Sequence, residues 1–197
     1  MMLTKLLVNK KGAATIFLVL ILAILLASII VITLDMTHIT RLAGDLDIAL
    51  DSSAKAASIQ IDENALLYGN VFIDKESALS IFKDMFERNF LSRGKTGQFL
   101  IEQSVFYPTS FKVEAEYYYI SPSTGNRIDL FVKVINTSTP EILSLGRYPY
   151  IISDISVDRS TIAVLGVLTY NRVGLLQRDP IVVKRVAVSQ LTAELVN

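Results

Sequence analysis

The amino-acid sequence predicts an α+β protein, in which a long N-terminal helix and a second helix precede an antiparallel β-sheet. Three observations lead to this fold class. A long apolar stretch lies near the N-terminus, apolar residues with helical spacing follow it, and apolar and polar residues alternate in the second half of the chain. Helices first and strands after is an order typical of α+β folds, where helices lie on one face of an antiparallel sheet.

The apolar stretch covers residues 13–34, which contain no charged residue, no proline and no glycine. In a helix, these residues span roughly 33 Å, enough to cross the hydrocarbon core of a bilayer. The apolar part of a cleaved secretory signal is usually shorter, about 7–15 residues. A retained transmembrane helix is therefore our expectation, with a cleaved signal as the alternative.

A basic leader, residues 1–12, precedes this helix and carries Lys5, Lys10 and Lys11 but no acidic residue. Positive charges concentrate on the cytoplasmic side of membrane helices. The sequence therefore predicts a single-pass protein of the cell membrane with a cytoplasmic N-terminus and an extracytoplasmic C-terminal part.

The helix is expected to continue beyond the apolar stretch as an amphipathic segment over residues 35–68. Apolar or small residues recur there at steps of three and four, the spacing of one helical face. They are Ile39, Leu42, Leu46, Ala49, Ser53 and Ala56. We expect one helix of about 50 residues, with Gly44 as its weakest interior point and its second half docked on the sheet.

A second helix is predicted at Asp74–Leu91 within an extracytoplasmic α+β head, residues 69–197. Asp74 is a suitable N-cap, because its carboxylate can accept hydrogen bonds from the first free backbone N–H groups. The apolar positions follow helical spacing and are expected to face the core. They are Ala78, Leu79, Ile81, Phe82, Met85, Phe86 and Phe90.

Alternation from residue 111 to residue 119 predicts a half-buried strand, with Phe111, Val113, Ala115, Tyr117 and Tyr119 on its buried face. A turn at 121–126 and a partner strand at 127–136 would complete a hairpin, and 137–149 would be a connection. Further strands are expected at 151–157, 161–170 and 180–191. The apolar segment 161–170 should be central, because it offers no polar face to solvent.

Tyrosines cluster in this half of the chain: Tyr107, Tyr117, Tyr118, Tyr119, Tyr148, Tyr150 and Tyr170. They are consistent with an interaction face or with ordinary strand packing, since tyrosine favours sheets.

Composition argues against several function classes. The chain has no cysteine, which excludes disulfides, thiolate metal sites and a cysteine nucleophile. The 19 basic residues balance the 19 acidic ones, and no basic stripe predicts nucleic-acid binding.

The single histidine, His38, lies between Asp35 and Arg41 at steps of three residues. This set is too small for a metal centre or a catalytic triad. We expect Asp35, His38 and Arg41 to be polar residues of the helix at the membrane surface, and we expect no enzyme activity, cofactor or metal.

Two segments carry a resemblance to a known family: KKGAATIFLVL, residues 10–20, and DIALDSSAKAAS, Asp47–Ser58. A basic leader ending in glycine, an apolar helix and an alanine-rich continuation resemble type IV pilin-like precursors. More narrowly, they resemble the TadE/TadG-like proteins of tight-adherence (Flp) pilus systems. The resemblance covers about a third of the chain. It implies a pilin-like fold and a structural or pilus-assembly role in a bacterial cell-surface appendage or secretion system.

The same resemblance implies membrane lipid and other pilin-like or pilus-assembly proteins as partners. It also implies a prepilin peptidase that would cleave between Gly12 and Ala13. Pilins carry a glutamate at the fifth position after this bond, where this chain has Phe17. That departure favours a protein that stays uncleaved in the membrane.

A different function class is also open, a single-span receptor or sensor ectodomain that binds an extracellular ligand. Such a protein would need a signalling partner, because 12 residues are too few for a cytoplasmic signalling domain. This requirement favours the structural role, in which the protein associates with others through its N-terminal helix.

Overall fold

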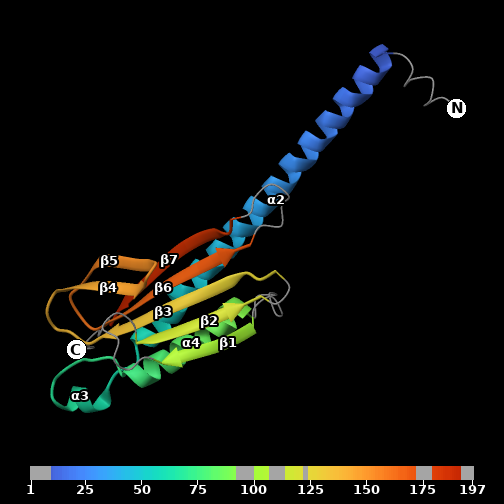
Figure 1. Ribbon diagram of the computed structural model, residues 1–197. Coiled ribbons are helices and arrows are strands. Elements are labelled where there is room, and N and C mark those ends of the chain that lie inside the picture. Colours follow the sequence, from blue (N-terminus) through green and yellow to red (C-terminus); the bar gives the residue numbers. More distant parts are fainter. Residues whose placement is uncertain (1–9, 92–99, 107–113, 122–123, 172–178, 192–197) are drawn as a thin grey trace, which may run out of the picture. The chain divides into compact units, whose positions relative to one another are not determined.

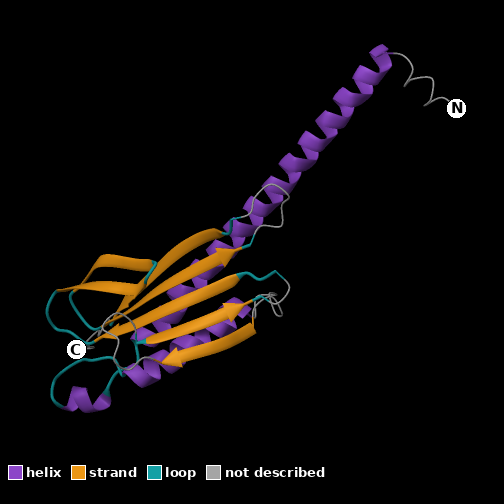
Figure 2. Cartoon of the chain, in the orientation of Figure 1, coloured by secondary structure: helices purple, strands orange, loops and turns teal. Residues whose placement is uncertain are grey.

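A computed structural model describes residues 10–91, 100–106, 114–121, 124–171 and 179–191. Its helices and strands confirm the predicted α+β class and are consistent with a pilin-like layout (Figures 1 and 2). The helices are α2 (Lys10–Ser58), α3 (Glu63–Leu67) and α4 (Lys75–Leu91). The strands are β1 (Leu100–Phe106), β2 (Ala115–Ile120), β3 (Arg127–Ile135), β4 (Glu141–Arg147), β5 (Tyr150–Val157), β6 (Thr161–Tyr170) and β7 (Ile181–Gln190).

The strands form two antiparallel sheets. The larger has the order β1-β2-β3-β6-β7, and β4 pairs with β5 in a separate two-stranded hairpin. The predicted hairpin is β2 and β3, which pair from Ala115↔Val132 to Ile120↔Arg127. The predicted central strand is β6, which lies between β3 and β7 and is buried on both faces. Because β6 is apolar on both faces, each face must pack against another part of the chain, and the fold provides a packing partner on each side.

One face of the large sheet, called the helix face below, packs against α2 and α4. Gly166 of β6 marks the close approach of α2, because a Cβ atom there would lie 2.7 Å from Leu50 Cδ1 and 3.6 Å from Leu46 Cδ1. On α4, Phe86 lies against Tyr119 of β2 with ring centroids 5.3 Å apart. The predicted apolar face of α4 is confirmed at its centre, since Phe82, Phe86 and Phe90 are all buried.

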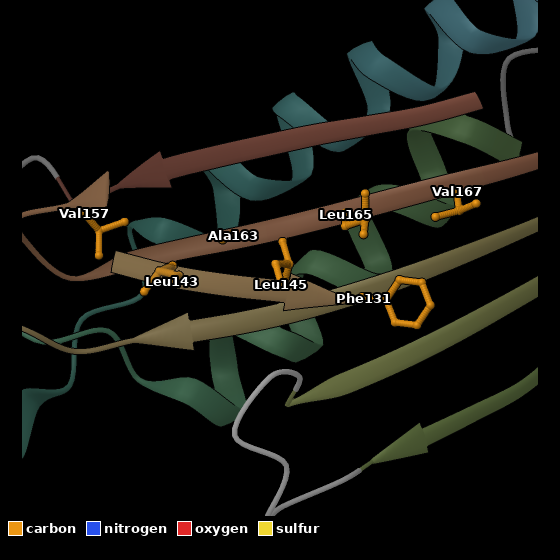
Figure 3. Packing of buried hydrophobic residues seen from close by; sticks show 7 residues of the cluster. All are labelled: Phe131, Leu143, Leu145, Val157, Ala163, Leu165 and Val167. Carbon is orange, nitrogen blue, oxygen red and sulfur yellow. The ribbon is translucent and has the colours of Figure 1, made fainter. Parts of the chain in front are cut away.

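The other face, called the hairpin face, is covered by β4 and β5. Figure 3 shows the apolar cluster that joins them to the large sheet. Its members are Phe131, Leu143, Leu145, Val157, Ala163, Leu165 and Val167. Alternate residues of β6 therefore supply the helix face and the hairpin face in turn, as the pleat of a strand requires.

The structure corrects one prediction in this half of the chain and adds a strand to it. The supposed connection at 137–149 contains β4, and β1 is a separate strand that the sequence analysis does not name. In β4, Gly146 adopts φ +103°, and a Cβ atom there would collide with the backbone of Tyr150 and the side chain of Leu165. Only glycine allows the hairpin to approach the sheet so closely, so a residue that looked like a turn signal belongs to a strand.

The amphipathic part of α2 is shorter than predicted, because the helix ends at Ser58 rather than near residue 68. Ile61 leaves the helical path to form a β-bridge with Ile73. Asp62 then caps the new helix α3, its Oδ1 accepting hydrogen bonds from the backbone N–H groups of Asn64 (2.9 Å) and Ala65 (3.2 Å). A strong N-cap starts a separate helix at this point.

The start of α4 is as predicted. Asp74 Oδ1 accepts a hydrogen bond from the N–H of Glu76 at 3.2 Å, and its Oδ2 accepts one from the Ser77 hydroxyl at 2.5 Å. The compact head includes α2 from Arg41 onward, so it begins well before residue 69. The predicted docking of the second half of the helix on the sheet is confirmed.

Candidate functional site: the exposed half of the long helix

The first half of α2 has an almost entirely exposed apolar surface. Its large apolar side chains from Ile16 to Met36 are all exposed, for example Phe17 at 67% and Leu26 at 54%. An apolar surface of this extent is unfavourable in water. It therefore requires an apolar environment that the described part of the chain does not supply.

Burial begins at Ile39 and continues along one face to the end of the helix. The buried residues are Ile39, Leu42, Ala43, Leu46, Ala49, Leu50, Ser53, Ala54, Ala57 and Ser58. Five of the six residues of the predicted stripe are among them, while Ala56 is only half-buried. The stripe is wider than predicted, because Ala43, Leu50 and Ala54 join it.

Four hydroxyl groups in and just beyond the exposed half donate hydrogen bonds within the helix itself. Ser28 donates to the carbonyl oxygen of Ile24 and Thr33 to that of Ile29, each at 2.8 Å. Thr37 and Thr40 make the same contact one turn back, to Thr33 and Met36. Such bonds allow hydroxyl side chains to lie in lipid, where water is not available to hydrogen-bond them.

The helix is long and apolar enough to cross a membrane, and no residue in its most apolar 18-residue segment is buried. The apolar core helix of a water-soluble protein would have most of these side chains covered. Within the described residues this one has none covered, which agrees with a single-pass membrane protein.

One face of the exposed half forms a shallow, mostly open depression, called the hollow below. Its lining residues are Thr15, Ile16, Val19, Leu20, Ala23, Ile24 and Ala27. Ala23 and Ala27 lie one turn apart, and their small side chains leave room for another helix to approach closely. Small residues spaced in this way are common where membrane helices pack against each other.

The polar residues singled out in the sequence all lie on α2. Asp35 is half-buried, whereas His38 and Arg41 are exposed. Among the described residues no hydrogen bond or ion pair joins the three, and no group of three metal-ligating side chains occurs. Gly12 and Ala13 are half-buried in the first turns of the helix, and their role as a cleavage site stays a prediction.

A buried ionic cluster on the hairpin face was not foreseen. Alternation along β2 placed Glu116 on the exposed side, yet its side chain is only 4% exposed, with Arg147 Nη1 of β4 3.7 Å from its carboxylate. The Tyr118 hydroxyl donates a hydrogen bond to Glu116. Next to them, Arg127 Nε donates to Asp129 Oδ1 at 2.6 Å. No sequence pattern predicts this cluster, because Arg147 lies in β4, in a segment that the sequence pattern indicates to be a connection.

Burial raises the pKa of the Asp129 carboxyl, and the nearby Glu116 charge raises it further, while Arg127 opposes the shift. Burial, together with the Glu87 charge, raises the pKa of Tyr117 to about 12. The described parts of the head thus hold carboxylates in structural ion pairs. No group of three metal-ligating side chains occurs among them.

The tyrosines divide between the two interpretations. Tyr117, Tyr119 and Tyr170 are buried and serve strand packing. Tyr118 and Tyr150 are half-buried, and Tyr148 at the hairpin turn is 86% exposed. Tyr107 lies outside the described residues, as do Phe111 and Val113 of the predicted strand.

Comparison of the chain with protein-family models, with curated proteins and with solved structures finds no match. The functional interpretation therefore depends on the geometry above and on the sequence resemblance.

Proposed function

We propose that this protein is a membrane-anchored structural component of a bacterial cell-surface appendage or secretion system, of the pilin-like or pilus-assembly (TadE/TadG-like) kind. The observation that carries the proposal is the division of α2. Its first half presents apolar side chains outward, and its second half is buried against the sheet of the head. A single helix that is both anchor and core element suits a subunit whose head is displayed at a membrane.

The orientation follows from charge. Lys5, Lys10 and Lys11 precede the apolar half, which favours a cytoplasmic N-terminus and an extracytoplasmic head. In this arrangement lipid surrounds the exposed half of α2, and the hollow at Ala23 and Ala27 receives a helix of a similar protein. The partners are thus membrane lipid and other pilin-like or pilus-assembly proteins.

Membrane fractionation of the full chain tests the anchor. We expect the protein in the membrane pellet after washes with high salt and with alkaline carbonate, and in solution only after detergent is added. Recovery in the soluble fraction without detergent would refute the proposal. Protease added to intact spheroplasts should remove the head, and survival of the head there, with digestion after lysis, would reverse the orientation.

N-terminal sequencing of the mature protein tests processing. A first residue of Ala13 would show cleavage by a prepilin peptidase and favour a pilus subunit. An intact leader would favour a permanent membrane-resident component of the assembly system, the outcome that Phe17 supports. A first residue well beyond residue 34 would instead identify a cleaved secretory signal.

A further inference from the structure

The segment between α2 and α4 exposes an unusual number of apolar side chains. We call these residues the tip: Ile59, Ile61, Leu66, Leu67, Tyr68 and Val71. Leu67 is 83% exposed and Tyr68 is 85% exposed, and no residue of α3 is buried. Scattered apolar residues are normal on a protein surface, but a group of this kind marks an interaction site.

The tip is held in a defined conformation. Ile73 forms a β-bridge with Ile61. The Asn136 side chain accepts a hydrogen bond from the Ile73 N–H at 2.9 Å and donates one to the Ile73 carbonyl oxygen at 2.8 Å. The Ser160 hydroxyl donates to the Val71 carbonyl at 3.1 Å. The tip is therefore a preformed surface, and its charge is negative, since residues 59–71 contain Asp62 and Glu63 but no lysine or arginine.

A second exposed apolar surface lies on the edge strand β7 and has the opposite charge. We call Val182, Lys184, Val186 and Val188 the β7 strip. The three valines are 37–40% exposed, although they lie on the hairpin face of the sheet. The hairpin does not reach over them, and residues 180–191 carry Lys184 and Arg185 but no acidic residue. Lys184 Nζ lies 5.5 Å from the centre of the Tyr150 ring, which holds the charge beside the valines.

We propose that the tip of one molecule binds the β7 strip of a second copy of this chain. Both surfaces are apolar, and their charges are opposite, so a contact between them buries apolar area while acidic side chains meet basic ones. Contacts between two tips or between two β7 strips would bring like charges together. Lys184 and Arg185 in the middle of β7 also oppose direct pairing of two edge strands.

This contact is heterologous, because it joins two different surfaces of the same protein. Each molecule then keeps one unused tip or one unused strip, and the contact can repeat in a ring or an open filament. The inference rests on the proposed structural function and deepens it, by naming the surfaces through which neighbouring heads associate.

Cysteine cross-linking of the full chain in detergent or in membranes tests the contact. The natural chain has no cysteine, so a Leu67→Cys copy and a Val186→Cys copy can be mixed, each with its own tag, and treated with a short bismaleimide. We expect a cross-linked dimer that carries both tags. Each variant alone should give little product.

Charge exchange gives a second readout. Glu63→Lys or Lys184→Glu alone should lower the cross-linking yield by about two- to five-fold, as expected for a partly exposed ion pair. Combining Glu63→Lys in the Leu67→Cys copy with Lys184→Glu in the Val186→Cys copy should restore the yield. Circular dichroism of each variant checks that the head is folded.

Three results would overturn the inference. One is a Val186–Val186 product, which would indicate edge-to-edge pairing, and another is a Leu67–Leu67 product, which would indicate a symmetric tip contact. The third is the absence of any product from folded variants. A blue shift of a fluorophore on Leu67→Cys in anionic vesicles would in that case assign the tip to lipid. Membrane recovery is scored on the same samples, so failure of this contact with normal membrane recovery leaves the anchor intact, and loss of membrane recovery defeats the proposed function itself.

Discussion

Leu26 and Leu50 lie in the same helix and have the same side chain, but they differ in what surrounds them. Leu26 is 54% exposed, whereas Leu50 is completely buried and lies next to Gly166 of β6. Helix propensity is the same for both, so it does not explain the difference. The apolar side chains in the first half of α2 need an apolar environment from outside the chain. Those on the buried face of the second half are covered by the sheet of the same chain. One uninterrupted helix therefore performs two jobs with different energetics.

Replacing these two leucines by alanine gives the largest expected contrast. Leu50→Ala should lower the free energy of unfolding of the head by about 2–5 kcal/mol, because it removes buried methyl groups and leaves a cavity. Leu26→Ala should change it by less than about 0.5 kcal/mol. Urea unfolding in detergent, followed by the near-ultraviolet circular dichroism of the tyrosines, measures both. Equal losses would mean that the first half is also part of the protein core.

Placing a charge in each half reverses the contrast. Ile24 and Ile48 are similarly exposed, at 58% and 51%, so each carboxylate would replace an outward-facing side chain. Ile24→Asp should weaken membrane insertion by about 2.5–3.5 kcal/mol, since an aspartate at the centre of a spanning helix is costly. Ile48→Asp should have little effect. The fraction recovered in the membrane pellet is the measurement, and a pellet unchanged by Ile24→Asp would argue that this half does not lie in lipid.

The ionic cluster adds a second difference between the two halves of the molecule. Its carboxylates lie in the head, so they make the stability of the head depend on pH. The pKa of Asp129 is raised by burial, so the folded head binds this proton more tightly than the unfolded chain does. The free energy of unfolding should therefore fall as the pH rises from about 3.9, the ordinary pKa of an aspartate, through the raised pKa of Asp129 in the folded head. Asp129→Asn should flatten this dependence and change stability at pH 7 by less than about 1 kcal/mol, because the half-exposed Arg127 can turn to water.

Arg127→Gln is the matched variant and should be more harmful, by about 1–3 kcal/mol at pH 7. It leaves the Asp129 carboxylate buried without its ion pair. Urea midpoints at pH 4 and pH 7 separate the two variants, with Arg127→Gln losing more stability at the higher pH. If Asp129→Asn were instead the less stable variant at pH 7, the larger cost would lie in leaving Arg127, and not Asp129, without its ion pair.

The elements that sequence predicted best are those whose environment is uniform along their length. The stripe on α2 faces the sheet throughout, and the run in β6 is buried on both faces, so the apolar pattern alone predicted Leu46 and Ile162 in the core. The Asp74 cap was predictable for the same reason, since it depends only on the neighbouring backbone.

What the sequence could not supply is the contact between distant segments. The hairpin β4–β5 has only Leu143 and Leu145 as apolar partners for the sheet on its first strand, and its glycine and flanking prolines resemble a loop. Alternation predicts an exposed Glu116, because its ion-pair partner Arg147 belongs to that unpredicted strand. The tip was mistaken for helix because its apolar residues continue the pattern of α2, although Asp62 begins a new helix there. The β7 strip could not be recognised before the sheet order was known.

The smallest effect expected is at Gly44, which lies just beyond the point where burial begins. It is exposed, has a helical neighbourhood, and a Cβ atom added there would meet nothing within 4 Å. Gly44→Ala should therefore raise the free energy of unfolding by about 0.5–1 kcal/mol, by restricting the unfolded chain and favouring the helix. The urea midpoint measures this, and Leu67–Val186 cross-linking should be unchanged. A more stable head with much weaker cross-linking would show that assembly needs backbone freedom at this glycine, and the gain in helix propensity would then have a functional cost.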